Sequence, residues 1–213
     1  MDIFKILQEE LQIGYKQVEA AVQLIDEGNT IPFIARYRKE ATGSLNDEVL
    51  RNLDERLRYL RNLDEKKEQV LSTIRDQEKL TPELEKQIQD AMTMVALDDL
   101  YRPYRPKRRT RAMIAKERGL EPLAELILLQ QGKEPLEKLA EDYVSEENEV
   151  PTAADALAGA KDIIAERISD QADYRTYIRQ ATMEQGMIRS QAKNEKAESV
   201  YEMYYQYEEP VKK

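Results

Sequence analysis

The stretch from Ser44 to Glu78, SLNDEVLRNLDERLRYLRNLDEKKEQVLSTIRDQE, predicts one long helix that serves as the spine of the fold. Apolar residues recur along it with heptad spacing, at Leu50, Leu53, Leu57, Leu60, Leu71 and Ile74. At 1.5 Å per residue such a helix is roughly 50 Å long, which exceeds the width of a small domain. We therefore expect a spine, or one half of a helical hairpin.

Polar residues stand at the start of this helix and at two positions in the middle of its apolar seam. Ser44 is the expected N-cap, and Asp47 and Glu48 lie in the first turn, where the helix dipole favours acids. Asp64 and Lys67 occupy the two seam positions between the apolar halves of the pattern. They are either a polar specificity device in the seam or an exposed interruption of it. We expect both to be exposed, because long charged side chains usually reach water.

A second helix is expected to return along the spine. Thr81, Pro82 and Glu83 supply an N-cap, a first-turn proline and a favourable acid. Its apolar stripe is expected at Leu84, Ile88, Ala91, Met92 and Val95, and its end at residues 97–100. Because the link between the two helices is short, they should be antiparallel neighbours.

Shorter helices before the spine resemble a helix-turn-helix. Apolar spacing predicts two helices that break near Gly14 and close at Gly28, after which Thr30 caps a third. The segment Ile31–Lys39 takes the place of a recognition helix. Its candidate contacts with nucleic acid are Arg36, Arg38 and Lys39. The alternative is an ordinary packing pair without any DNA contact, and such a pattern more often means this.

The segment Tyr101–Arg111, YRPYRPKRRTR, is a basic island in an acidic chain. Pro103 and Pro106 predict a stiff, non-helical arm that presents its guanidinium groups instead of packing them. Tyrosines beside arginines suit phosphates and stacked bases. The candidate contacts are Tyr101, Arg102, Tyr104, Arg105, Lys107, Arg108, Arg109 and Arg111. An acidic protein partner, or acidic helices of the same molecule, would suit the arm equally well.

The remaining chain predicts further helices and one strand. A helix begins at Arg111 and ends at Gly119, and the apolar run 120–129 should be buried. After a short helix that reaches Tyr143, the loop 145–151 is the best domain boundary, which divides the chain into 1–100, 101–147 and 148–213. Caps at Thr152 and at Ser169-Asp170 start two more helices, the second of which adds to a basic stripe of Arg167, Arg175 and Arg179.

The last residues should form one short strand, 187–190, that lacks a partner. Four tyrosines follow, and they are expected to pack as core against the preceding helices; they are Tyr201, Tyr204, Tyr205 and Tyr207. The predicted fold class is therefore all-α, a multi-helix bundle with a helix-turn-helix-like N-terminal part, a long central helix in a helical hairpin and one short strand near the C-terminus.

The composition excludes several classes of function. The 213 residues contain no Cys and no His, which removes thiolate chemistry, the commonest metal ligands and the commonest general base. We expect no catalytic residues, no metal and no cofactor, and a cytoplasmic protein without a membrane span. The formal net charge of -9 opposes binding of a polyanion by the whole surface, so any contact with RNA or DNA must be local.

Three uncommon segments carry a family resemblance. They are IPFIARYRKEATGSLNDE (residues 31–48), LYRPYRPKRRTRAMIAKERGLEPLA (residues 100–124) and AGAKDIIAERISD (residues 158–170). Together they resemble the N-terminal region of the bacterial Tex family of transcription accessory proteins. The resemblance implies a chain truncated before an RNase H-like domain, helix-hairpin-helix elements and an S1 domain. It carries over Arg36, Tyr37, Arg38, Lys39 and the arm Tyr101–Arg111 as candidate contacts.

Two hypotheses about function follow. In the first, the chain is the helical scaffold of a nucleic-acid-binding transcription accessory protein, and the arm is an auxiliary phosphate contact. The resemblance implies that most binding of RNA or DNA belongs to the missing C-terminal domains. In the second, the chain is a protein-interaction module that docks on transcription machinery or on the protein's own C-terminal domains. An enzyme is not expected.

Overall fold

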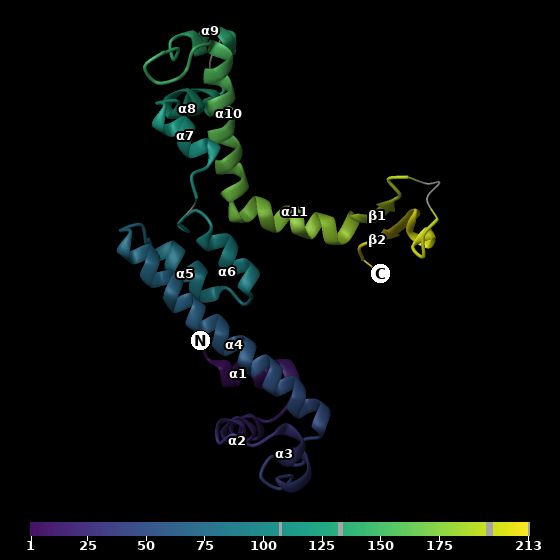
Figure 1. Cartoon of the computed structure of the whole chain (residues 1–213). Helices are drawn as coiled ribbons and strands as arrows, with labels where there is room; N and C mark the ends of the chain where they lie inside the picture. Colours follow the sequence, from purple (N-terminus) through teal and green to yellow (C-terminus); the bar gives the residue numbers. More distant parts are fainter. Residues whose placement is uncertain (107, 132–133, 195–197, 213) are drawn as a thin grey trace. The chain divides into compact units, whose positions relative to one another are not determined.

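The computed structural model describes residues 1–106, 108–131, 134–194 and 198–212 of the chain (Figure 1). Eleven helices and one two-stranded sheet are assigned in this part, which confirms the predominantly helical fold class. The chain separates into two compact units, Met1–Leu97 and Asp98–Lys213. The three-part division expected from the sequence stays a prediction.

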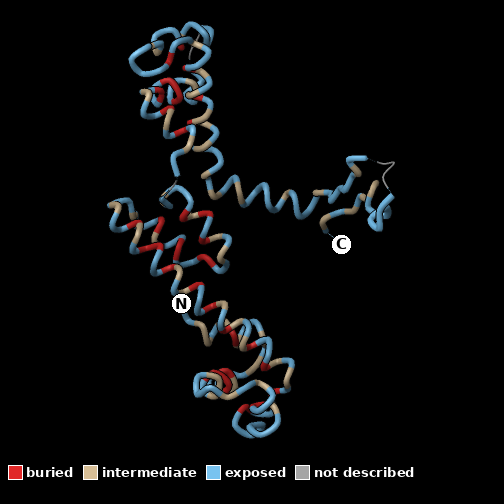
Figure 2. Tube along the Cα trace, in the orientation of Figure 1, coloured by how far each residue is buried: buried red, intermediate tan, exposed pale blue. Residues whose placement is uncertain are grey.

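The first unit is built on the predicted spine. Its helices are α1 (Ile3–Leu11), α2 (Tyr15–Asp26), α3 (Ile31–Tyr37), α4 (Asp47–Asp76) and α5 (Pro82–Asp90). The spine, α4, is 30 residues long and buries one continuous stripe of its surface (Figure 2). The N-terminal half of this stripe packs against α1, α2 and α3 in one hydrophobic core, and α5 packs against its C-terminal half.

The N-cap of α4 differs from the expectation. Ser44 lies in a left-handed turn with φ of 65°, and the cap is Asn46, whose side chain accepts a 2.8 Å hydrogen bond from the Val49 amide. Either residue type caps helices well, so the choice depends on the turn that precedes the helix. The Gln17 side chain holds this turn, since its Nε2 donates to the Gly43 carbonyl at 3.0 Å.

Lys67 is buried, and the expectation that it is exposed is wrong. Only 3% of its surface is accessible, and its Nζ donates a 2.6 Å hydrogen bond to the Gln89 carbonyl at the end of α5. Burial lowers the pKa of the Lys67 ammonium, although the charges of Asp64 and Asp90 oppose this shift. Asp64 is half-buried. The polar seam position therefore bonds α4 to α5.

The returning helix is interrupted, which the sequence pattern did not indicate. After α5 ends at Asp90, Thr93 caps a separate helix, α6 (Met94–Tyr101). The first amide of α6 donates to the Tyr59 hydroxyl of α4 at 2.9 Å, so a spine side chain takes up one of its unpaired N–H groups. Met92 and Val95 are exposed instead of forming one stripe with Leu84 and Ile88.

Helix α10 (Ala153–Asp170) organises the second unit. It packs against α7 (Arg111–Glu117), α8 (Glu121–Leu129) and α9 (Leu136–Glu141) around one hydrophobic core. In the run 120–129, Leu120, Leu123 and Ala124 are buried, but three leucines are exposed, contrary to expectation; they are Leu126, Leu128 and Leu129. A helix only nine residues long can turn only one face toward a single partner layer, so a run that is apolar all round cannot be fully buried there.

Beyond α10 the chain buries little. Gln171, and not Ser169-Asp170, separates α10 from α11 (Ala172–Gln185), which has no buried residue (Figure 2). The predicted strand, β1 (Met187–Gln191), does have a partner, because β2 (Gln206–Pro210) pairs with it antiparallel. The expectation of a tyrosine core is also wrong, since Tyr201 and Tyr204 are exposed beside the 3-10 helix Glu202–Tyr204.

Candidate nucleic-acid interface

The arm 101–111 follows directly from the end of α6. Tyr101 is buried, and its carbonyl accepts hydrogen bonds from the amides of Tyr104 and Arg105. The first part of the arm, residues 102–105, is therefore a turn that continues α6, and regular structure is absent among the described residues from there to Thr110. Lys107 lies outside the described residues.

Most arm arginines contact carboxylates of the same unit. Arg102 pairs with Asp170 at 3.0 Å, Arg105 with Asp98 at 2.8 Å, Arg109 with Glu117 at 2.8 Å and Arg111 with Asp162 at 3.5 Å. The Arg105 guanidinium also lies 5.5 Å from the centre of the Tyr101 ring. These contacts match the alternative in which the arm binds acidic residues of the same molecule. Among the described residues, Arg108 has no hydrogen-bond or ion-pair partner.

The paired arginines nonetheless remain accessible to solvent. Their side chains are between 45% exposed, at Arg102, and 86% exposed, at Arg111. Exposed ion pairs contribute only about 0–1 kcal/mol each, because water screens the charges and ordering the side chains costs entropy. A phosphate could therefore replace the carboxylate at small cost at Arg105 and Arg109, whose acidic partners are exposed as well.

The basic stripe on α10 and α11 is neutralised in a different way. Arg175 and Arg179 both donate 2.6 Å hydrogen bonds to Asp99, which is only 4% exposed, and Arg167 pairs with Glu125 at 2.6 Å. Burial raises the pKa of the Asp99 carboxyl, but the hydrogen bonds and charges of the two arginines outweigh it and hold this pKa below its usual value. Arg175 and Arg179 are thus held in a structural contact.

The candidates of the first unit lie at the end of α3. Arg36 is exposed on the helix, while Arg38 and Lys39 lie just beyond its last residue. The Arg38 guanidinium is 5.7 Å from the centre of the Phe33 ring. The side chains of Arg36 and Lys39 make no ion pair within the described part of the chain. The helix-turn-helix interpretation of α2 and α3 stays a prediction.

Two arginines beside α3 were missed from the sequence. Arg51 and Arg58 are seven residues apart on α4 and line an open pocket together with Gly28, which precedes α3, and Pro32, in the first turn of α3. The spacing of seven residues places both side chains on one face of α4, and this spacing could have identified them as candidate contacts from the sequence. The sequence could not indicate that this face adjoins α3.

Other kinds of site find little support in the described residues. Among them, no group of three His, Cys, Asp or Glu side chains is placed to hold a metal ion. None of their helices combines the length and the apolar character needed to cross a bilayer.

Comparison with known proteins identifies two matching family models. The model "Tex-like protein N-terminal domain" matches residues 1–75, and the model "Tex central region-like" matches residues 131–213. The transcriptional accessory protein Tex of Neisseria gonorrhoeae is 44% identical over 215 residues, which cover 100% of this chain and 28% of that protein.

Relatives extend beyond one bacterial group. The uncharacterised protein YdcI of Bacillus subtilis is 45% identical over 210 residues, which cover 97% of this chain and 29% of that protein. The human S1 RNA-binding domain-containing protein 1 is 28% identical over 179 residues, which cover 84% of this chain and 18% of that protein. The chain thus spans less than a third of the length of these relatives.

Proposed function

Since the chain belongs to the Tex family of transcription accessory proteins, we propose that it is a non-catalytic helical scaffold that contributes an auxiliary phosphate contact through the arm 101–111. Most of the nucleic-acid affinity of a full-length protein would then lie outside this chain. The name of the human relative, which contains an S1 RNA-binding domain, agrees with RNA as one partner.

The observation that carries this proposal is the charge of the arm. No acidic residue occurs from Tyr101 to Arg111, and the described arginines of the segment are exposed in a chain of net charge -9. Arginine binds phosphate through two parallel N–H groups, and it can do so here by exchanging a weak surface ion pair. Arg108 has no described ion pair to exchange and is the most available contact.

The test is a charge reversal in the arm. Fluorescence anisotropy would measure binding of a labelled oligonucleotide to the chain across a salt series, with and without the double substitution Arg108→Glu and Arg109→Glu. Each lost phosphate contact should reduce the slope of log K against log salt concentration by about 0.7 for a single strand or about 0.9 for a duplex. Unchanged affinity and slope would rule out the arm as a contact.

A matched control separates local contact from net charge. Lys79 and Lys86 are exposed cations of the first unit, and neither side chain makes an ion pair in the described part of the chain. Reversing both to Glu changes the net charge by the same amount as the arm variant. If this control weakened binding equally, the effect would be general electrostatics and not a site.

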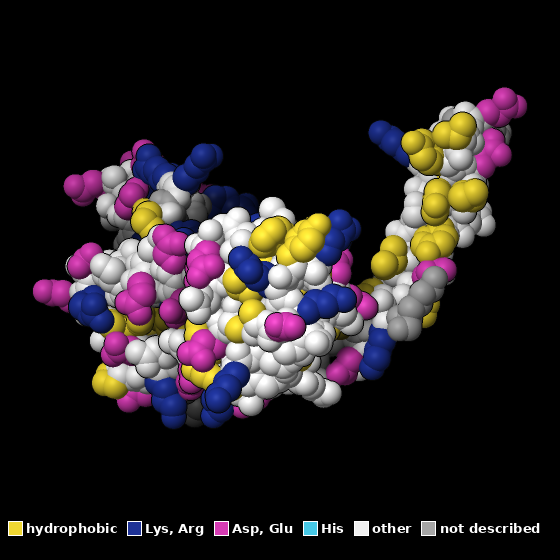
Figure 3. Space-filling model, turned by 90° about the horizontal axis from the view of Figure 1, so that it is seen from below, with side chains coloured by type: hydrophobic (Ala, Val, Ile, Leu, Met, Phe, Trp, Pro, Cys, Tyr) yellow, Lys and Arg dark blue, Asp and Glu magenta, His cyan; other side chains and the backbone are white. Residues whose placement is uncertain are grey.

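A second candidate function, that of a protein-interaction module, is favoured by apolar side chains that are exposed at the surface. Hydrophobic side chains gather along α11 and the strands that follow it (Figure 3). They include Tyr177, Ile178, Met183, Met187 and Ile188, each more than half exposed. Apolar side chains that gather in one part of a surface favour a protein contact there. Capture from a lysate treated with nuclease distinguishes the two functions, since a protein partner survives the treatment and a nucleic-acid bridge does not.

A further inference from the structure

Helix α3 turns two aromatic rings toward solvent. Phe33 is 37% exposed and Tyr37 is 63% exposed, and their ring centres are 5.3 Å apart at an angle of 46°. On a neighbouring face of the helix, Ile34 is completely buried in the core of the first unit. This anchor fixes the direction in which the two rings point, so they form a preformed aromatic surface.

Positive charge surrounds these rings. The segment 31–39 contains no acidic residue, and Arg38 lies over the Phe33 ring at 5.7 Å. Arg36 shares the exposed side of α3 with the rings, and Lys39 follows in the next turn. Because neither Arg36 nor Lys39 has a described ion-pair partner, both are available to an anion without loss of an internal contact.

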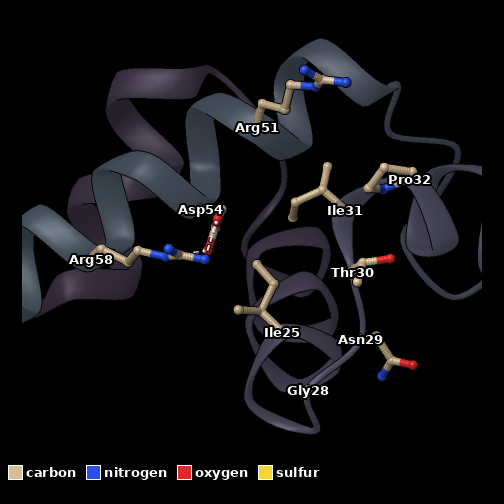
Figure 4. Close-up of a pocket in the computed structure, with 9 residues that line it drawn as sticks. All are labelled: Ile25, Gly28, Asn29, Thr30, Ile31, Pro32, Arg51, Asp54 and Arg58. Carbon is tan, nitrogen blue, oxygen red and sulfur yellow. Dashed lines mark hydrogen bonds and ion pairs between the residues drawn. The ribbon is translucent and has the colours of Figure 1, made fainter.

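Two open pockets of about 520 Å³ and 450 Å³ share Pro32 and Arg51 in their walls, and together they form one groove between α3 and α4. Arg36 and Lys39 link this groove to the aromatic surface, since both line the smaller pocket, whereas Phe33 and Tyr37 line neither pocket. In the larger pocket, α4 supplies Arg51, Asp54 and Arg58, and residues from the end of α2 to the first turn of α3 form the facing wall (Figure 4). The groove as a whole contains four cations and two acids; the cations are Arg36, Lys39, Arg51 and Arg58.

Both acids of the groove are already neutralised by groove arginines. Asp47 pairs with Arg51 at 2.7 Å, and Asp54 pairs with Arg58 at 2.8 Å. The Arg51–Asp47 pair is exposed on both sides, so it contributes little to stability and exchanges easily, whereas the Asp54 side chain is only 15% exposed. The groove thus keeps a positive excess within a chain that is acidic overall.

From this arrangement we propose that α3 and the first half of α4 bind single-stranded nucleic acid, with bases stacked on Tyr37 and Phe33 and phosphates along the groove over Arg36, Lys39 and Arg51. The inference rests on the proposed function and adds a second contact to it. An aromatic platform beside a cationic groove favours unpaired bases, because a duplex keeps the faces of its bases stacked inside. A seven-residue helix with bulky rings on its exposed face is poorly suited to reading base edges in a major groove.

The test compares three probes of equal length with the whole chain. Fluorescence anisotropy with single-stranded RNA, single-stranded DNA and duplex DNA should give tighter binding of one or both single strands than of the duplex. Tyr37→Ala should weaken single-strand binding by about 5- to 100-fold, as expected for the loss of one stacked base. Tyr37→Phe keeps the ring and should bind nearly as well as the parent chain.

A second variant tests the groove independently of the ring. Arg36→Glu with Lys39→Glu should reduce the salt slope by about 1.4, as two lost single-strand phosphate contacts predict. The double substitution Lys79→Glu with Lys86→Glu again controls for net charge. Circular dichroism should show unchanged helix content in every variant, which is expected because all four side chains are exposed.

The outcomes separate this inference from the proposed function. If the arm variant weakens binding while the Tyr37 and Arg36/Lys39 variants do not, the inference is overturned and the arm contact stands. Duplex DNA bound as tightly as single strands would likewise overturn it. If no probe binds at low salt, both proposals fall. Weakening by the α3 variants alone would support this surface and exclude the arm.

Discussion

Asp99 and Arg175 are 76 residues apart in the sequence, and the Arg175 Nε donates a 2.6 Å hydrogen bond to the buried Asp99 carboxylate. Arg179, one turn further along α11, binds the other carboxylate oxygen at the same distance. Helix α11 has no buried residue. These charged contacts therefore hold α11 to the rest of its unit, whereas apolar packing holds the other helices.

Asp99→Asn should loosen α11 from the rest of the second unit. The substitution leaves two arginines without their carboxylate, and we expect a loss of about 1–3 kcal/mol, below the cost of a fully buried pair because the arginines are partly exposed. Hydrogen exchange of the α11 amides should accelerate while that of α10 changes little. Asp98→Asn, at the exposed neighbouring residue, is the control and should cost less than 1 kcal/mol. Equal effects of the two variants would contradict this role of Asp99.

The contribution of Asp99 to stability should depend on pH in a defined direction. The pKa of its carboxyl is lower in the folded chain than in the unfolded chain. Its stabilising effect is therefore complete above the unfolded pKa of about 3.9 and is lost as pH falls through the lower folded value. Urea unfolding of the parent chain and of Asp99→Asn should give a difference in free energy that is constant near neutral pH and shrinks below about pH 4. A difference that grows on acidification would contradict the assigned shift.

Gly159→Ala should destabilise the second unit, although alanine is normally the better helix former. A Cβ at Gly159 in α10 would overlap Leu120 Cδ1 and lie 3.2 Å from the Ala115 Cβ. We expect a net loss of about 1–3 kcal/mol from overpacking, measured by thermal unfolding. In a Leu120→Ala background the same substitution should become neutral or stabilising. Stabilisation in the parent chain would show that α10 does not approach α7 and α8 this closely.

Asn46→Ala should destabilise the start of α4. The Asn46 side chain caps the Val49 amide, and loss of such a cap costs about 0.5–2 kcal/mol. Asn46→Asp keeps the acceptor and should retain the parent melting temperature or raise it. Thermal unfolding of the three proteins provides the measurement. If Asn46→Asp lost as much stability as Asn46→Ala, the side-chain oxygen would not be acting as a cap.

The sequence predicted α4 well because thirty residues of one period leave little freedom of interpretation. The sequence could not predict that Lys67 is buried, because this depends on a residue distant in the sequence. Its partner is the backbone carbonyl of Gln89, which no sequence pattern indicates. The interruption between α5 and α6 was equally unmarked, because residues 91–93 include neither Gly nor Pro.

Tertiary packing also gives different exposure to residues that look alike in the sequence. Asp98 and Asp99 are adjacent carboxylates, yet one side chain is 56% exposed and the other is 5% exposed. The exposure of Tyr37, which carries the proposed stacking surface, depends on how Ile34 is anchored. The sequence shows the cations at the end of α3 but could not bring the α4 arginines beside them, because their proximity arises only when the helices pack.

The apolar stripe of α4 contacts α1, α2 and α3 along its first half and α5 along its second half. One uninterrupted helix thereby makes two packing regions into a single cooperative unit. A break in its middle would abolish this cooperation without removing any core contact. Proteolytic cleavage between these halves, near residue 65, would then leave two fragments that each melt at lower temperature than the intact unit, even while every side chain that packs remains present.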